Sequence, residues 1–262
     1  MSEPVLVIQG LGKTFRKAAK ATQAVQALDS VSFSVDEGEY VCLLGRSGCG
    51  KSTLLGILAG LIAPDEGLAL CRGTSIQGPD RHRMLMFQEA ALFPWLNVFN
   101  NVLYSLKFVH ELSKGQKCER AESFLDLVGL ADYHHFRIHE LSGGMRQRVA
   151  LARALAPDPD ILLMDEPFSA LDAMTREQLY TDMQRIWRTT NKTILMVTHN
   201  VREAVCLGTR VLVMERPGRV IADEKVLLPY PRAMNDTALV RAAADISGHL
   251  QKTDEHGQEK AG

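Results

Sequence analysis

Short apolar runs occur early in the chain, and turn residues bound each of them. They cover residues 5–9, 31–35 and 40–44, and Asp36, Glu37 and Gly38 separate the last two. Apolar runs of this length between turn residues predict β-strands. Because no helical pattern lies between these runs, we expect an antiparallel β lobe at the start of the fold.

The hydrophobic period changes to that of an α-helix at Lys51, and this helical pattern ends before Pro64. Further along, strand patterns alternate with helical ones. The predicted strands are 84–87, 161–164, 193–197 and 211–214, and the predicted helices are 119–128, 145–155, 172–188 and 201–207. This alternation predicts an α/β fold with a mainly parallel sheet that helices cover on both faces. The largely helical stretch 90–157 predicts an inserted α-helical lobe.

The charge balance and the cysteine pattern exclude several classes of protein. Among 262 residues, Lys and Arg number 30 and Asp and Glu number 31, and a net charge of −1 argues against a general nucleic-acid binder. Five widely spaced cysteines without a C-x-x-C pair favour reduced thiols over a disulfide framework or a zinc site. The chain starts without the features of a signal peptide, and no charge-free stretch has the character of a membrane span. We expect a soluble chain that reaches a membrane only through a partner.

A glycine-rich loop follows the predicted strand 40–44 and opens the helix that begins at Lys51. It matches G-x-x-x-x-G-K-[ST], and its residues are Gly45, Arg46, Ser47, Gly48, Cys49, Gly50, Lys51, Ser52 and Thr53. In a strand–loop–helix context, glycines let backbone N–H groups converge on phosphates at a positive helix end. Lys51 is then placed to reach the β- and γ-phosphates of a nucleotide and Ser52 to bind Mg²⁺. The alternative is an ordinary glycine-rich turn before a helix.

Cys49 is interpreted as a small residue of this loop. Its place at a helix N-terminus predicts a lowered thiol pKa and makes it a candidate for alkylation.

Two carboxylates follow the predicted strand 161–164, at the end where ligands of open α/β sheets bind. Asp165 is expected to hold the Mg²⁺ shell, and Glu166 to orient or polarise the attacking water. Taken alone, the pair is also compatible with a strand end that happens to be acidic. Together with the phosphate-binding loop it indicates a nucleotide hydrolase.

The run Leu141-Ser142-Gly143-Gly144 precedes the predicted helix 145–155. It resembles the L-S-G-G-Q signature of the ATP-binding-cassette family, except that Met145 stands in place of the usual Gln. Ser142 is a good helix N-cap, and the two glycines expose N–H groups at a positive helix end, which makes a second anion site. One γ-phosphate does not need two such sites from one lobe. The economical interpretation is a homodimer in which each signature covers the nucleotide of the other copy.

The remaining marks of the family occur in the expected order, and the resemblance covers residues 5–221. It implies a P-loop NTPase (RecA-like) parallel-sheet core with an antiparallel β lobe and the helical lobe. By resemblance, Gln88 is the Q-loop residue at the Mg²⁺ and the water, Asp172 belongs to the D-loop at the dimer interface, and His199 is the switch histidine at the γ-phosphate. Phe15 occupies the position of the aromatic that stacks on adenine, although a packed loop residue in the basic stretch 13–20 is the alternative.

A stand-alone cassette without a fused membrane segment is typical of bacterial importers. The runs 78–88, 92–98 and 216–220 resemble the nitrate/sulfonate/taurine importer subfamily. The resemblance implies integral membrane permease subunits, an indirect periplasmic or lipid-anchored solute-binding protein, and a place at the cytoplasmic face of the inner membrane. Phe93, Pro94 and Trp95 offer an apolar face for a permease helix, unless Trp95 is a core residue. Three alternatives stay open: a non-transport cassette, a cassette for another solute or for export, and a P-loop kinase.

Two further features complete the prediction. His134, His135 and His139 include an i, i+4 pair, but without companion ligands they indicate a solvated surface more than a metal site. Residues 222–262 form a short C-terminal extension, too small for an independent domain, and we expect its polar end from residue 251 to be frayed.

Overall fold

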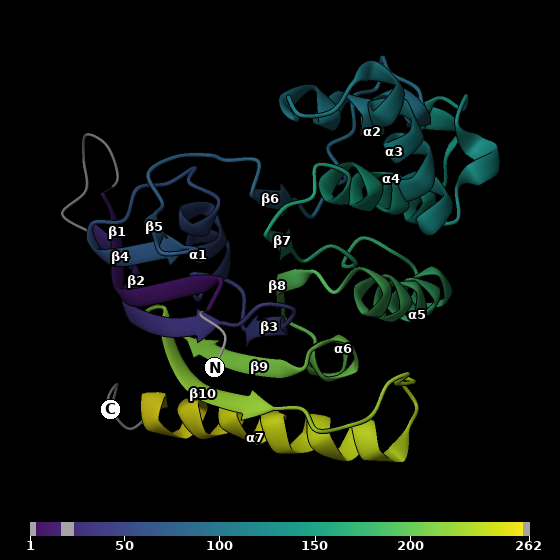
Figure 1. Cartoon of the computed structure of the whole chain (residues 1–262). Helices are drawn as coiled ribbons and strands as arrows, with labels where there is room; N and C mark the ends of the chain where they lie inside the picture. The colour runs from purple at the N-terminus through teal and green to yellow at the C-terminus, as the bar shows by residue number, and fades with distance from the viewer. Residues whose placement is uncertain (1–3, 17–23, 259–262) are drawn as a thin grey trace. The chain divides into compact units, whose positions relative to one another are not determined.

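The computed structural model describes residues 4–16 and 24–258, with side-chain surroundings up to residue 250. The chain divides into two compact units, shown in the ribbon diagram of Figure 1. The first unit comprises Met1–Pro79 and Thr193–Gly262, and the second comprises Asp80–Lys192. The second unit is therefore longer than the helical lobe that the sequence predicts at 90–157.

The first unit contains the antiparallel lobe that the sequence predicts. Its sheet has the order β2-β1-β4-β5. The strands are β1 (Leu6–Arg16), β2 (Ala24–Val35), β4 (Glu66–Cys71) and β5 (Thr74–Ser75). β1 and β2 are about twice as long as predicted, because their outer halves mix polar and apolar residues and lack the regular pattern on which the prediction rests.

Three parallel strands and one antiparallel strand form the rest of the sheet structure in the first unit. β3 (Tyr40–Gly45) pairs in parallel with both β8 (Thr193–Thr198) and β9 (Arg210–Glu215), and every residue of β3 and β8 is buried. β10 (Arg219–Lys225) is antiparallel to β9. The helices α1 (Lys51–Leu58) and α6 (Val201–Leu207) follow β3 and β8 directly.

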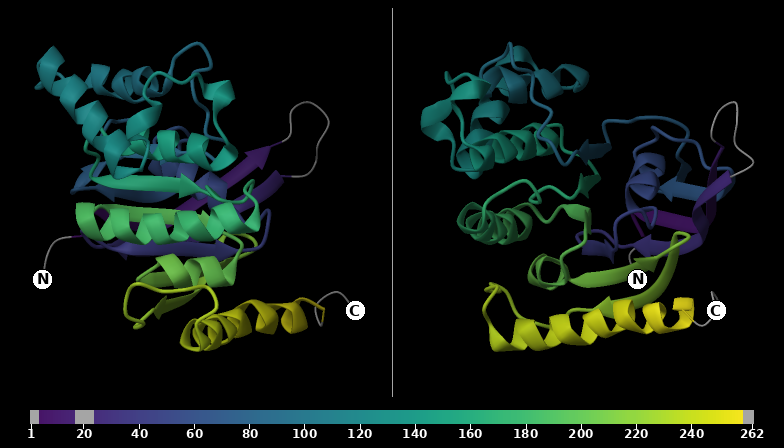
Figure 2. Two further views of the ribbon diagram at one scale, coloured as in Figure 1. Left: turned by 90° about the vertical axis from the view of Figure 1, so that its right-hand side faces the viewer. Right: turned by 180° about the vertical axis from the view of Figure 1, so that it is seen from behind.

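The second unit combines a short parallel strand pair with the predicted helices. β6 (Arg83–Met86) pairs with β7 (Ile161–Asp165) in a register that sets Met86 opposite Met164. Its α-helices are α2 (Val98–Ser105), α3 (Lys114–Leu127), α4 (Gly143–Leu155) and α5 (Ala173–Thr190). Short 3₁₀ turns occupy Leu106–Phe108, Ala131–Tyr133 and Ile138–Glu140. Figure 2 shows α2, α3 and α4 gathered beside one another, and α2 packs against both of the others.

The C-terminal extension of the first unit contains one long helix. Helix α7 (Thr237–Gln258) packs on α6 and on the hairpin of β9 and β10. The bounds of the helix include residues 251–258, residues 259–262 lie outside the described residues, and the frayed end stays a prediction. Within the described residues, no helix combines the length and hydropathy that crossing a bilayer requires.

Candidate functional site: a nucleotide-binding ATPase centre

The predicted phosphate loop lies between β3 and α1, in the strand–loop–helix order that the sequence predicts. Arg46, Ser47 and Gly48 are exposed at its tip, and Ser52 is exposed in the first turn of α1. That turn contains no acidic residue, so no carboxylate offsets the positive end of the helix. The loop is therefore electrostatically suited to a phosphate group.

Two glycines of the loop are required by the close approach of neighbouring backbone. Gly50 has a φ of +104°, and a Cβ atom there would lie 2.2 Å from the carbonyl oxygen of Ala27. A Cβ atom on Gly45 would lie 2.4 Å from the carbonyl oxygen of Met214. Both spacings are too short for any other residue, so β2 and β9 fix the path of the loop on either side.

The side chain of Lys51 lies inside the curve of the loop. It is only 5% exposed, and its Nζ donates to the carbonyl oxygens of Gly45 at 2.7 Å and Arg46 at 2.9 Å. A lysine ammonium has three donors and tolerates burial only when partners compensate it. The loop itself supplies these partners, so it holds a positive charge next to its exposed N–H groups.

The prediction for Cys49 is wrong. Its side chain is 2% exposed, and burial raises the pKa of the thiol although Lys51 and Arg216 oppose the shift. The helix N-terminus does not offset the loss of solvation, because the thiol lies under the loop instead of at its surface. Cys49 is a small buried residue and is a poor target for alkylation.

Arg216 is a residue of the site that the sequence did not single out. It follows β9, and its Nε donates to the carbonyl oxygen of Gly48 at 3.0 Å. Gly218 lies in the same turn, and its N–H donates to the carbonyl oxygen of Glu215. Its Cα also lies close to the carbonyl oxygen of Ala27, the same atom that leaves no room for a Cβ atom on Gly50. The turn 216–218 thus holds the phosphate loop through the contact of Arg216 with Gly48. In the sequence analysis this turn contributes only to the subfamily resemblance, because its spacing does not indicate a contact with the loop.

His199 lies at the same sheet edge as the phosphate loop. β3 and β8 are parallel, with Leu44 opposite Thr198, so Gly45 at the end of β3 and His199 just after β8 lie at the same edge of the sheet. His199 is exposed and borders a cavity of about 510 Å³ between α6 and α7. The hydroxyl of Thr198 donates to the buried carboxylate of Glu203 and accepts the N–H of Asn200 at 3.0 Å, which fixes the backbone on both sides of His199.

Phe15 is an exposed strand residue. It lies in β1 opposite Val25, its side chain is 43% exposed, and Lys13 Nζ lies 5.6 Å from the ring centroid. The alternative of a packed loop residue is therefore wrong, whereas stacking on adenine stays a prediction. Residues 17–20 of the basic stretch lie outside the described residues.

In the second unit, the two carboxylates lie at the carboxyl end of β7. Asp165 ends the strand and Glu166 follows it with a φ of +42°, in the left-handed region that non-glycine residues rarely adopt. The carbonyl of Glu166 accepts hydrogen bonds from the N–H of Ser169 at 3.2 Å and its hydroxyl at 2.9 Å. Neighbouring groups often hold a residue in such a strained backbone conformation at functional sites, where its side chain must point at a reacting group. The backbone of Glu166 is consistent with a site of this kind.

Gln88 comes from the neighbouring strand end in the same unit. It follows β6, which is parallel to β7, and its side chain is exposed. The side-chain amide of Gln147 in α4 donates to the backbone carbonyl of Gln88 at 2.9 Å. Arg153 of the same helix donates to the carbonyls of Ala90 and Ala91 at 3.0 and 2.9 Å. Helix α4 therefore holds the segment that carries Gln88.

The signature turn begins helix α4 as predicted. Ser142 is the N-cap, and its hydroxyl accepts the N–H of Met145 at 3.3 Å, so the substitution of Gln by Met leaves the cap intact. A Cβ atom on Gly144 would lie 2.4 Å from Thr175 of α5, and one on Gly143 would lie 3.2 Å from Leu171. The two glycines therefore allow the signature turn to pack closely on the D-loop segment.

Asp172 caps the N-terminus of helix α5. Its carboxylate accepts the N–H of Thr175 at 3.0 Å. The side chain of Thr175, and then this N–H, lower the pKa of the Asp172 carboxyl by hydrogen bonding to it. Its contact with a nucleotide or a second copy stays a prediction.

Two surface predictions are also tested. Trp95 is 69% exposed, so it is not a core residue. Of the three histidines, His134 stacks on Phe99 at 5.9 Å, and His135 and His139 are exposed. Within the described residues, no group of three His, Cys, Asp or Glu side chains is arranged to hold a metal ion.

Comparisons with known proteins agree with this assembly of motifs. A family model described as ABC transporter matches residues 28–169. The chain is 46% identical over 237 residues to the taurine import ATP-binding protein TauB of Ruegeria pomeroyi, with 88% of this chain and 85% of the relative covered. It is 50% identical over 200 residues to TauB of Burkholderia pseudomallei, with 76% of each covered. Among solved structures, it is similar to the dimeric ATP-binding cassette MJ0796 bound to ADP and Pi, with a TM-score of 0.73, 31% identity, and 86% of this chain and 100% of that chain covered.

Proposed function

Because the chain belongs to the ABC transporter family of ATPases, we propose that it is the ATP-hydrolysing subunit of a bacterial importer for a small sulfonate or a related anion. The first candidate for the solute is taurine, since relatives that are 46% and 50% identical to this chain are taurine import ATP-binding proteins. Nitrate and other sulfonates are further candidates from the sequence.

The observation that carries the proposal is the presence of two anion-binding turns on one chain. The phosphate loop coils around Lys51, and the signature turn opens α4 with Ser142 as its cap. Two copies of the chain bind two ATP molecules between them, and each nucleotide contacts the phosphate loop of one copy and the signature turn of the other. The related cassette MJ0796 is dimeric with ADP and Pi, which supports this arrangement.

Hydrolysis follows from the polar groups at the strand ends. Lys51 and the loop N–H groups stabilise the charge on the β- and γ-phosphates. Glu166 orients the attacking water and polarises it, and His199 and Gln88 position the γ-phosphate and that water. Closure of the dimer on ATP moves the permease subunits, and release of phosphate lets the dimer reopen.

The same residues suit a magnesium ion. The exposed hydroxyl of Ser52, the carboxylate of Asp165 and the side-chain oxygen of Gln88 are hard oxygen donors, the type that Mg²⁺ prefers. When bound, the ion neutralises charge on the phosphate oxygens.

Exposed aromatic residues near Gln88 are the proposed contact for the permease. Trp95 and Phe87 are 69% and 49% exposed, and the Phe93 ring packs against Trp95 in a tilted arrangement at a centroid distance of 5.4 Å. Aromatic anchors of this kind dominate many protein interfaces. The subunit then works at the cytoplasmic face of the inner membrane, where it is held by the permease and receives solute from a periplasmic or lipid-anchored binding protein.

Reconstitution tests the solute and the coupling. The chain is combined in proteoliposomes with the permease encoded beside it, and ATP hydrolysis is measured with the neighbouring binding protein loaded with taurine, nitrate or an alkanesulfonate. The proposal predicts stimulation by taurine or another sulfonate over the unloaded binding protein. Equal hydrolysis with all solutes, or transport of solute outward, would contradict it.

A further inference from the structure

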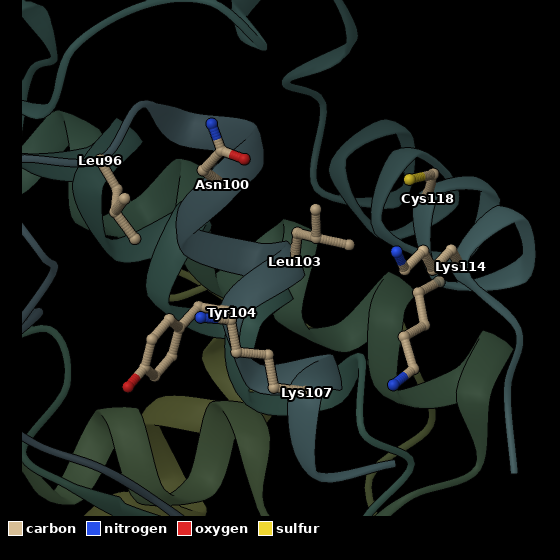
Figure 3. A pocket seen from close by; sticks show the side chains of 8 residues that line it. Leu96, Asn100, Leu103, Tyr104, Lys107, Lys114 and Cys118 are labelled. Atoms are coloured by element: carbon tan, nitrogen blue, oxygen red, sulfur yellow. The ribbon is translucent and has the colours of Figure 1, made fainter. Parts of the chain in front are cut away.

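A recess separates helices α2 and α3 of the second unit. It has a volume of about 460 Å³ and lies between Leu103 and Tyr104 of α2 and Lys117 and Cys118 of α3. Figure 3 shows Leu103 and Cys118 facing the same space from the two helices. None of the residues that line it belongs to the phosphate loop, the strand-end carboxylates or the signature turn. The recess is thus separate from the proposed nucleotide site.

The floor of the recess is apolar and firmly held. Leu96, Leu103 and Tyr104 are half-buried, and the Tyr104 ring packs on Phe93 at a centroid distance of 4.6 Å. Asn101 of the same helix is fully buried; its amide binds the backbone on both sides of Leu96. An apolar surface on a fixed scaffold is typical of a preformed small-molecule site.

Three ammonium groups surround this floor, from Lys107, Lys114 and Lys117. In the part of the chain that the structure describes, none of the three takes part in an ion pair. Lys114 and Lys117 also lie in the first turns of α3, and no acidic residue occupies its first turn. Their charges repel each other and oppose the positive helix end, so an anion between them relieves an unfavourable interaction.

We propose that this recess binds a free small amphipathic anion, with a sulfonate or carboxylate head between the lysines and an apolar body on Leu103 and Tyr104. Ligand sites of about 300–1,000 Å³ hold single drug-sized molecules, and the recess lies in that range. Lys107 Nζ lies 4.4 Å from the ring centroid of Tyr104, so the aromatic face already compensates part of its charge. A neutral ligand leaves Lys114 and Lys117 without an anionic partner, and a small hydrophilic anion leaves the apolar floor in water. A bilayer surface is a poorer match, because the cations converge around a recess instead of lying on a flat face.

The thiol of Cys118 provides a reporter for occupancy. Cys118 is half-buried at the recess, whereas Cys42, Cys49, Cys71 and Cys206 are buried. A ligand on the floor therefore slows modification of Cys118 by a maleimide and leaves the other thiols unaffected. Mass spectrometry of the full-length protein gives this rate directly.

The experiment compares octane-1-sulfonate below its micelle concentration with 1-octanol and methanesulfonate, which retain only the apolar body or only the head. We expect octane-1-sulfonate to protect Cys118, with binding roughly tenfold or more tighter than that of either control. The variant with Lys114→Gln and Lys117→Gln weakens binding roughly 3- to 20-fold. Lys225→Gln in β10 is the matched control and leaves it unchanged.

Three results would overturn the proposal. One is equal protection by octanol and octane-1-sulfonate, which would make the recess merely apolar. Another is unchanged labelling of Cys118 at every concentration. The third is protection by phosphatidylglycerol vesicles, but not by free octane-1-sulfonate, which would assign the lysines to a membrane surface. The readout is binding alone, so an error in the assigned transport function does not alter it.

Discussion

Gln147 of the signature helix donates a hydrogen bond from its side-chain amide to the backbone carbonyl of Gln88, at 2.9 Å. Gln147 is only 5% exposed, so water does not easily replace its amide as the donor to the Gln88 carbonyl. This bond links the helix that begins with Ser142 to the segment that carries the proposed water- and metal-binding glutamine. The second unit thus couples two motifs that are 59 residues apart in the chain.

The first prediction concerns this link. Gln147→Leu removes the side-chain amide that donates to the backbone carbonyl of Gln88. We expect kcat for ATP hydrolysis to fall several-fold while ATP affinity changes little, because the phosphate loop is untouched. Steady-state kinetics and nucleotide titration measure the two quantities. Gln77→Leu, at an exposed position after β5, is the control. Equal loss in both variants, or a loss confined to affinity, would contradict the coupling.

The second prediction concerns the role of Glu166. Glu166→Gln keeps the size of the side chain and removes the carboxylate that activates water. We expect phosphate release to fall by about 100-fold or more, with ATP binding retained. A matched variant, Glu177→Gln on the exposed face of α5, keeps full turnover. Wild-type hydrolysis by Glu166→Gln would show that another group activates the water.

The third prediction tests the backbone support beside His199. Thr198 is 1% exposed, and its hydroxyl both donates to Glu203 and accepts from Asn200. Thr198→Val is nearly isosteric and leaves a buried carboxylate without this donor, at a cost of about 1–3 kcal/mol. Calorimetry should show a melting temperature lower by roughly 2–4 °C per kcal/mol lost. Thr198→Ser keeps the hydroxyl and is expected to recover most of the stability, and a variant as unstable as Thr198→Val would count against the hydrogen bond.

The fourth prediction concerns the pH dependence of thiol labelling. Burial raises the pKa of Cys49, so a smaller fraction of thiolate is present at pH 7–8 than for an ordinary cysteine. Labelling of Cys49 with N-ethylmaleimide should therefore be slow at neutral pH and increase as the pH rises above the usual thiol range. Cys118 serves as the half-buried comparison in the same sample. Faster modification of Cys49 than of Cys118 at pH 7 would contradict the buried position.

The strand ends that carry chemistry could be predicted from sequence. The strands β3 (Tyr40–Gly45) and β7 (Ile161–Asp165) are short apolar runs. A strand that is buried on both faces consists almost entirely of apolar residues, so the sequence indicates where it lies and where it ends. The topology of the sheet then determines where the residues after these strands lie, and Lys51 and Glu166 are two of them. The parallel register of β3 and β8 brings His199 to the same edge for the same reason.

The supporting contacts could not be predicted in this way. Arg216 meets Gly48 across 168 residues, and Gln147 meets Gln88 across 59, so neither pair shares a local pattern. Cys49 was assigned a low pKa from its place before a helix, but its pKa depends on burial, which the three-dimensional packing decides. Likewise, helix α7 packs on α6 and β9, and these contacts leave no local pattern in its sequence.

The most direct measurement of the central claim is a cross-link between two copies of the chain. One copy carries Ser142→Cys and the other Ser47→Cys, both with Cys118→Ser and Glu166→Gln, and a short bismaleimide is added with or without ATP. If the signature of one copy covers the phosphate loop of the other, ATP produces the mixed covalent dimer, and neither variant alone gives comparable product. Dimerisation on ATP, seen by light scattering, without the mixed cross-link would contradict a nucleotide site that two copies share.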